Sequence, residues 1–190
     1  MRLSERIIVD PARVEAALAG DDAAIEALLR AAWPHAYRIA LSILRDPVCA
    51  EDAAQNACAV MLHALPRLRA AEAFGAWVYR IVVREAFALG RRLPQHEPLA
   101  ADALASGSCL TDAEVRIDVL SALGKLSPNE CAAVALHYYA DLTSADIAEI
   151  LEMPDSTVRY HLMRARRKLE ALLDGHRPAY SLRGALHVVD

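Results

Sequence analysis

The sequence predicts an all-α protein with two small helical domains joined by a flexible linker. Apolar residues make up 55% of the 190 residues and aromatic residues only 5%, so the apolar share rests on Ala, Leu, Val and Ile, of which the first two favour helix. Helix-start signals recur along the chain. Residues 94–112 contain two prolines and a glycine without a sustained apolar period, which indicates a linker between residues 1–93 and 113–174. Residues 175–190 form a C-terminal tail.

Two Asp-Pro pairs predict helix starts in the first domain, which is expected to be a bundle of three or four helices. Asp10 and Asp46 each offer an N-cap side chain, and a proline at the first helical position loses no needed hydrogen bond. Helices should therefore begin near residues 11 and 47. The second of these should end at Pro66.

Glycine and proline also divide the rest of this domain. Gly20 marks a break before a helix over residues 22–33. Pro34 is expected to open a separate helix that runs to Leu44. A last helix is predicted from about residue 73 to residue 92.

The second domain contains the clearest helix start. A first helix should begin at residue 111 or 112. Ser127 then supplies an N-cap, with proline next and the capping-box Glu130 after it. Thr143 opens a similar short helix, and a proline in the following turn precedes a longer helix over residues 155–173.

At 100° per residue this last helix has an apolar stripe and a polar, basic face. The stripe consists of Val158, Leu162, Ala165, Leu169 and Leu172. The other face carries Ser156, Arg159, Tyr160, Arg164 and Arg167. A short helix, a turn and a second helix of this kind form a helix-turn-helix unit, whose second helix lies in the major groove. An ordinary amphipathic helix with a solvated charged face gives the same pattern.

The helix over residues 73–92 carries a second basic face. Arg80, Arg84, Phe87 and Arg91 share it, while Phe74, Val78, Ile81 and Leu89 occupy the other side. Arginines interleaved with an aromatic residue, beside Trp77, suit a nucleic-acid strand with stacked bases. A solvated basic face with a buried aromatic residue is the alternative.

Charge and chemistry exclude several classes of protein. The net charge of -4 argues against a general polyanion binder, but residues 159–168 hold five Lys/Arg and no acid, so nucleic-acid contact should begin there. Four cysteines without a CxxC pair argue against a disulfide framework or a zinc finger. The sequence shows no catalytic grouping, metal-ligand pattern or phosphate loop, so neither an enzyme nor a cofactor is expected. The charged start and the lack of a long apolar run predict a cytoplasmic protein without membrane insertion.

Over about residues 15–173 the chain resembles the extracytoplasmic-function (ECF) sigma factors of the sigma-70 family. The runs DPVCAEDAAQN and FGAWVYRIVVREAFALGRR look like sigma region 2. The runs LTSADIAEIL and STVRYHLMRARRKL look like sigma region 4. The ordered pair is more specific than either region alone. The resemblance implies a transcription initiation factor that gives promoter recognition to RNA polymerase, with its beta and beta-prime subunits, promoter DNA and an anti-sigma factor as partners.

The resemblance also implies roles for matching residues. The residues implied to bind polymerase are Asp46, Glu51, Asp52, Gln55 and Asn56. Reading of the minus-ten element falls to the segment over residues 65–73 and to Trp77, Arg80, Arg84, Phe87, Arg91 and Arg92. Reading of the minus-thirty-five element falls to Asp155, Ser156, Thr157, Arg159, Tyr160, His161, Arg164 and Arg167.

The sequence departs from the family pattern in places. Asn56, Ala57 and Cys58 replace an acid, a threonine and a large aromatic residue, and Leu62 stands where tryptophan is usual, which weakens the expected polymerase contact. Arg84 stands where asparagine is common, which discards an amide that could read a base edge, and Glu152 replaces a frequent glycine. Two alternatives stay open: a sigma-mimic adaptor that sequesters an anti-sigma factor, and a stand-alone helix-turn-helix transcriptional regulator.

Overall fold

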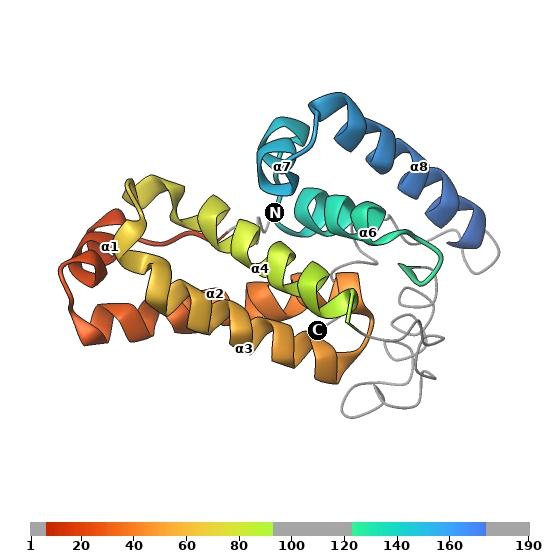
Figure 1. Cartoon of the computed structure of the whole chain (residues 1–190). Helices are drawn as coiled ribbons and strands as arrows, with labels where there is room; N and C mark the ends of the chain where they lie inside the picture. The colour runs from red at the N-terminus through yellow and green to blue at the C-terminus, as the bar shows by residue number, and fades with distance from the viewer. Residues whose placement is uncertain (1–6, 93–122, 174–190) are drawn as a thin grey trace.

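The structure, a computed structural model, describes residues 7–92 and 123–173. Within these ranges the chain forms helices and no strands, which confirms the all-α prediction (Figure 1). The first unit contains α1 (Pro11–Leu18), α2 (Asp22–Leu44), α3 (Pro47–Ala64), the 3-10 turns η1 (Leu65–Arg67) and η2 (Ala71–Ala73), and α4 (Phe74–Gly90). The predicted linker, the helix start at residue 111 or 112 and the tail lie outside the described residues.

Within residues 123–173 the second unit shows α-helices and one π-helical turn. Its elements are α6 (Pro128–Val134), the π-helical segment η4 (Ala135–Tyr139), α7 (Ser144–Leu151) and α8 (Asp155–Leu173). In this unit the starts of α6, α7 and α8 agree with the predicted starts, but no sequence pattern indicated the π-helical turn after α6.

Side-chain caps explain why these helices begin where they do. The Asp10 carboxylate accepts the Ala12 N–H at 3.0 Å, and the Asp46 carboxylate accepts the Cys49 N–H at 2.8 Å. Ser127 and Thr143 each open a complete capping box at the starts of α6 and α7. Each cap satisfies N–H groups that would otherwise lack an acceptor, and contributes about 1 kcal/mol.

The prediction that Pro34 opens a new helix is wrong, because α2 runs through it without a break. Pro34 is exposed, so its missing N–H lies on the solvent side of the helix. The flanking Ala32 and Ala36 are fully buried, as is Ile39 one turn later. An interior proline costs about 3 kcal/mol, and burying one large aliphatic side chain gains about 1.5 to 3 kcal/mol. The buried stripe of α2 therefore outweighs the lost hydrogen bond.

The two units share one continuous hydrophobic core. Leu136, Tyr139 and Ile147 of the second unit belong to the same cluster of buried side chains as the residues of α2, α3 and α4. Helix α6 contacts α2, and α7 contacts α4. Two helical units were expected from the sequence, but nothing in the sequence indicated that they pack against each other.

Polar contacts also join the two units. The Arg45 guanidinium donates to the carbonyl oxygen of Gly124 at 2.8 Å, and it lies 3.4 and 3.5 Å from those of Leu123 and Leu126. The Tyr139 hydroxyl accepts from Arg38 at 3.2 Å and lies 3.1 Å from Nδ1 of His35. Both contacts connect α2 or its C-cap to the second unit.

The turn between α7 and α8 holds a residue in an unfavourable backbone conformation. Glu152, the C-cap of α7, has φ 53° and ψ 45°, in the left-handed region that favours glycine. Glu152→Gly is therefore expected to raise the free energy of unfolding by about 0.5 to 1 kcal/mol. Urea denaturation measures the difference.

Glu149→Gly is the matched control for this prediction. Glu149 is exposed, and it lies within α7, where glycine costs about 1 kcal/mol of stability. The two glycine variants should shift the urea midpoint in opposite directions. Destabilisation by both would show that the left-handed turn carries no strain.

Candidate nucleic-acid and polymerase interfaces

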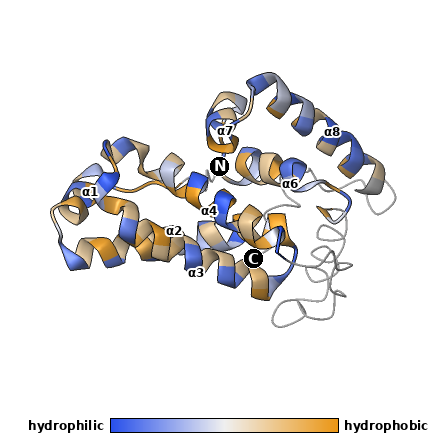
Figure 2. Ribbon diagram, viewed as in Figure 1, coloured by the Kyte–Doolittle hydropathy of each residue, from blue (hydrophilic) through white to orange (hydrophobic). Residues whose placement is uncertain are grey.

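Helices α7 and α8 form a helix-turn-helix arrangement on the outside of the molecule. Figure 1 shows α8 on the outer side of the second unit, where it packs on α6 and α7. Val158, Ala165 and Leu169 of the predicted stripe are buried, and Leu162 is half-buried. The opposite side of α8 is largely hydrophilic (Figure 2). The fold therefore presents the basic face of α8 to the surroundings.

The structure divides the eight residues predicted to read duplex DNA into two groups. The exposed residues are Ser156, Arg159, Tyr160, Arg164 and Arg167. The half-buried residues are Asp155, Thr157 and His161. Asp155 is ion-paired with Arg159 at 2.5 Å, and Nδ1 of His161 is buried without a hydrogen-bond partner in the described part of the chain. The exposed group occupies the side that a nucleic-acid duplex could approach.

Behind α8 lies a buried carboxylate to which the sequence assigned only a capping role. Glu130 is 1% exposed, and one of its carboxylate oxygens lies 2.7 Å from both the Ser127 N–H and Nζ of Lys168. Its other oxygen lies 3.1 Å from Nε of Arg164. One carboxylate thus joins the N-terminus of α6 to two successive turns of α8.

The surroundings of Glu130 keep it ionised. Burial by itself raises the pKa of this carboxyl, but the hydrogen bonds from Lys168 and Ser127 and the charge of Lys168 outweigh burial, so its pKa lies below the usual value. A buried carboxylate needs such partners, because an unpaired charge in the interior is strongly destabilising. The three donors thus account for the burial of a charged group here.

Helix α4 presents the second basic face. Arg80, Arg84 and Arg91 are exposed, as is Arg92 just after the helix. The opposite side of α4 is buried, which confirms the predicted division of the helix. Its buried or half-buried residues are Phe74, Val78, Ile81 and Leu89.

The two aromatic residues assigned to this face of α4 lie deeper than the arginines. Trp77 and Phe87 are half-buried and pack against the hydrophobic core. The Trp77 ring lies 6.0 Å from that of Phe74. Stacking of a base on either ring would use only its exposed part.

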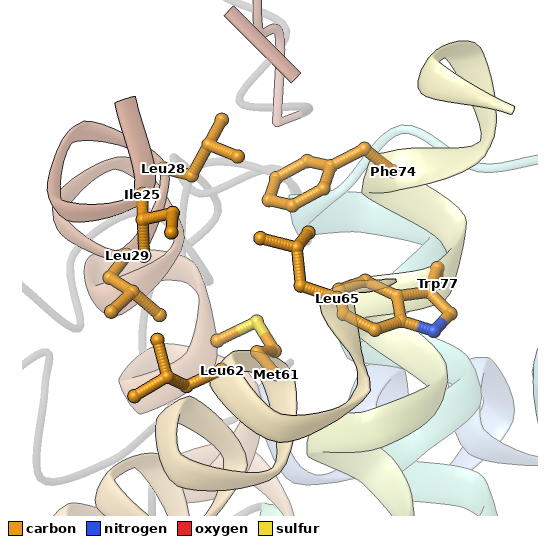
Figure 3. A pocket seen from close by; sticks show the side chains of 8 residues that line it. All are labelled: Ile25, Leu28, Leu29, Met61, Leu62, Leu65, Phe74 and Trp77. Atoms are coloured by element: carbon orange, nitrogen blue, oxygen red, sulfur yellow. The ribbon is translucent and has the colours of Figure 1, made fainter. Parts of the chain in front are cut away.

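Trp77 also lines an apolar pocket between α2, the end of α3 and the start of α4 (Figure 3). Its lining consists of Ile25, Leu28, Leu29, Met61, Leu62, Leu65, Phe74 and Trp77. The pocket adjoins the start of the segment over residues 65–73 that was expected to read the minus-ten element. No polar side chain lines it, so it offers no group to recognise the edge of a base.

The acidic residues expected to bind polymerase lie on the outer face of α3. Glu51, Asp52, Gln55 and Asn56 are exposed, while Asp46 is half-buried and caps the helix. The amide of Gln55 donates to Glu51 at 3.3 Å. Most of the buried residues of α3 are alanines, whose small side chains let α3 approach α2 closely. These are Ala50, Ala53, Ala54 and Ala57.

The structure divides the departures from the family pattern in α3 into those on its buried side and those on its exposed side. Ala57 lies on the buried inner face of α3, and Cys58 is half-buried. These two changes therefore affect the packing of α3 more than they affect its outer surface. Asn56 and Leu62 are exposed, and Leu62 is 48% accessible. Only the latter two changes alter the outer surface of α3.

Within residues 7–92 and 123–173 no three His, Cys, Asp or Glu side chains lie close enough together to hold a metal ion, and none of the helices has the length and hydropathy to span a membrane. Burial raises the pKa of the Cys131 thiol to about 12, so it stays protonated at neutral pH.

Comparison with known proteins gives the same two regions. Residues 24–92 match the family model described as sigma-70 region 2, and residues 116–169 match that described as sigma-70, region 4. The ECF RNA polymerase sigma factor SigM of Mycobacterium tuberculosis is 30% identical over 166 residues, which cover 86% of this chain and 84% of SigM.

Two solved structures share the fold. CnrH in complex with the cytosolic domain of CnrY has a TM-score of 0.69 at 22% identity, over 88% of this chain and 99% of that one. The sigma factor RpoE in complex with the anti-sigma factor NepR from Bartonella quintana has a TM-score of 0.64 at 21% identity, over 78% of this chain and 96% of that one. With both regions matched in order and a full-length relative at this identity, the chain belongs to the ECF sigma factors of the sigma-70 family.

Proposed function

We propose that this sigma factor starts transcription by dividing promoter recognition among three surfaces. The exposed acidic face of α3 binds core RNA polymerase through its beta-prime subunit. The arginine face of α4 binds the minus-ten element as the strands open, and the basic face of α8 reads the minus-thirty-five element as a duplex. The chain acts by binding and not by catalysis, in the cytoplasm, where polymerase and promoter DNA are found.

The observation that carries this proposal is the exposure of two separate basic faces on a chain with a net negative charge. Arg80, Arg84 and Arg91 share the surface of α4, while Arg159 and Arg167 lie on the outer side of α8. Guanidinium groups bind phosphates and guanine edges in a fixed fork geometry. The net charge of -4 fits a protein that binds DNA together with a larger enzyme.

An anti-sigma protein is the proposed regulator. Each of the two solved structures named above contains a second protein, which in the RpoE complex is an anti-sigma factor. In this chain the two units already contact each other through α2, α4, α6 and α7. A partner that binds both units could hold them in this arrangement and keep α4 and α8 from spanning a promoter.

Transcription with purified core RNA polymerase tests the proposal. Genomic DNA of the source bacterium is transcribed with core enzyme alone and with core enzyme plus the chain, and new 5′ ends are mapped. Discrete starts that need the chain are expected. A chain that neither binds core enzyme nor produces such starts would contradict the proposal and favour a sigma-mimic adaptor. A stand-alone helix-turn-helix regulator would bind DNA without core enzyme.

Arg84→Gln and Arg164→Gln are the informative variants in this assay. Each removes one exposed guanidinium, and each is expected to lower transcript yield about 5- to 150-fold, because one good arginine contact contributes about 1 to 3 kcal/mol. Arg13→Gln removes an exposed arginine of α1, far from both faces in the sequence, and should leave the yield unchanged. Equal yields from all three variants would contradict the assigned faces.

A further inference from the structure

We infer that Glu130 is a positioning residue for promoter reading: it orients Arg164 on the recognition helix and fixes the register of α8 on α6. This inference rests on the proposed role of α8 in DNA recognition. Glu130 itself, 1% exposed and at the start of α6, does not touch DNA.

The apolar packing of α8 leaves its exact orientation open. Its buried contacts are made by Val158, Ala165 and Leu169, which are small or aliphatic. Apolar contacts are non-directional, so they fix the orientation of a helix less closely than directional bonds do. Hydrogen bonds with charged partners are directional and fix geometry. Glu130 supplies two such contacts to α8.

Through these contacts Glu130 binds two successive turns of α8. Glu130 lies 3.1 Å from Nε of Arg164 and 2.7 Å from Nζ of Lys168, which are four residues apart on the same face. The carboxylate itself is held by the Ser127 N–H at 2.7 Å, within the capping box of α6. The N-terminus of α6 is thus the fixed point from which both side chains of α8 are held.

The contact with Glu130 leaves part of the Arg164 guanidinium available to bind DNA. Nε faces Glu130, while the side chain remains 54% exposed and Nη1 lies 3.5 Å from the Tyr160 hydroxyl. A guanidinium can bind a carboxylate with one edge and a phosphate or base with the other. Glu130 therefore fixes the direction of Arg164 and, through it, the exposed ring of Tyr160.

Glu130→Gln tests this role in the full chain bound to core RNA polymerase. Gln is isosteric and can still accept from Ser127, but it loses the charge that holds Arg164 and Lys168. Open-complex formation is compared on one mapped promoter and on the same promoter with its minus-thirty-five element scrambled. The preference for the intact element is expected to fall about tenfold, because one well-placed arginine contact discriminates to that degree.

The preference ratio separates positioning from stability. Partial unfolding lowers the active fraction equally on both templates, so the ratio does not change. Ser127→Ala weakens the cap but leaves the contacts of Glu130 with α8, and should preserve the ratio. In Arg164→Gln, the further change Glu130→Gln should lower the ratio by less than it does in the wild-type chain, because one of the two residues through which Glu130 acts, Arg164, is already absent.

The salt dependence of promoter binding gives a second test of the role of Glu130. If only overall charge mattered, neutralising an acid near DNA should tighten binding. Loss of an oriented phosphate contact should instead reduce by about one the slope of the logarithm of the DNA-binding constant against the logarithm of the salt concentration. An unchanged ratio and slope in Glu130→Gln, or an additive loss in the double variant, would overturn the inference. A wild-type chain without preference for the intact element would instead refute the role of α8 itself.

Discussion

Asp52→Lys is expected to reduce promoter-dependent transcription at least about tenfold without unfolding the protein, because a like-charge contact in an interface costs several kcal/mol and 1.4 kcal/mol is tenfold in affinity. Asp52 is exposed on the outer face of α3, next to Glu51 and one turn before Gln55. The resemblance to ECF sigma factors pairs this face with basic residues of the polymerase. Co-purification with core enzyme and transcript yield measure the loss, and circular dichroism reports the fold.

Glu15→Lys is the matched control for this variant. Glu15 is an exposed acid on α1, so the substitution changes the net charge by the same amount on a different surface. The control should retain wild-type transcription and binding to core enzyme. If both variants lose activity equally, the effect comes from overall charge, and α3 is not the polymerase-binding surface.

Local hydrogen bonding explains why most helix boundaries could be predicted from the sequence. A cap joins side chain and backbone within three residues, as Asp46 does with Cys49 and Ser127 with Glu130. Such contacts depend little on the rest of the fold. The failure at Pro34 has the opposite cause, because the continuity of α2 depends on burial against α3, which no local pattern reveals.

In the candidate site, too, the features set by local sequence could be predicted, and the contacts between distant residues could not. Helical periodicity correctly placed Arg80 and Arg84 on the surface of α4, since the buried side of that helix is apolar. It could not show that Arg164 is held by Glu130, 34 positions earlier in the chain. The capping-box signal was the only sign of Glu130 in the sequence, and it correctly gave the bond to Ser127 but nothing about α8.

The contact between the two units depends on a residue that local structure disfavours. Arg45 ends α2 with φ 60°, in the left-handed region where glycine is the least strained residue. Its side chain donates to Gly124 at 2.8 Å and lies near two further carbonyls of the second unit. Glycine at this position would suit the turn better, but it would lose the link between the units.

Arg45→Gly is accordingly expected to loosen the second unit while leaving α2 intact. The variant relieves the left-handed turn but removes a charged hydrogen-bond donor, whose contribution is about 1.5 to 3 kcal/mol. Opening of the interface should therefore become at least about tenfold more frequent. Hydrogen exchange of peptides that cover residues 123–142 measures it, with α3 as the internal reference that should not change.

Two hydroxyl deletions show whether the effect belongs to the interface. Tyr139→Phe removes the hydroxyl that contacts Arg38 and His35 and should also raise exchange in the second unit. Tyr79→Phe removes a buried hydroxyl that accepts the Ile7 N–H at 3.0 Å within the first unit, and should leave the second unit unchanged. Unaltered exchange in both Arg45→Gly and Tyr139→Phe would mean that the shared apolar core alone holds the units together. Faster exchange in these two variants only would show that polar contacts with α2 control how readily α6 and α7 separate from the first unit.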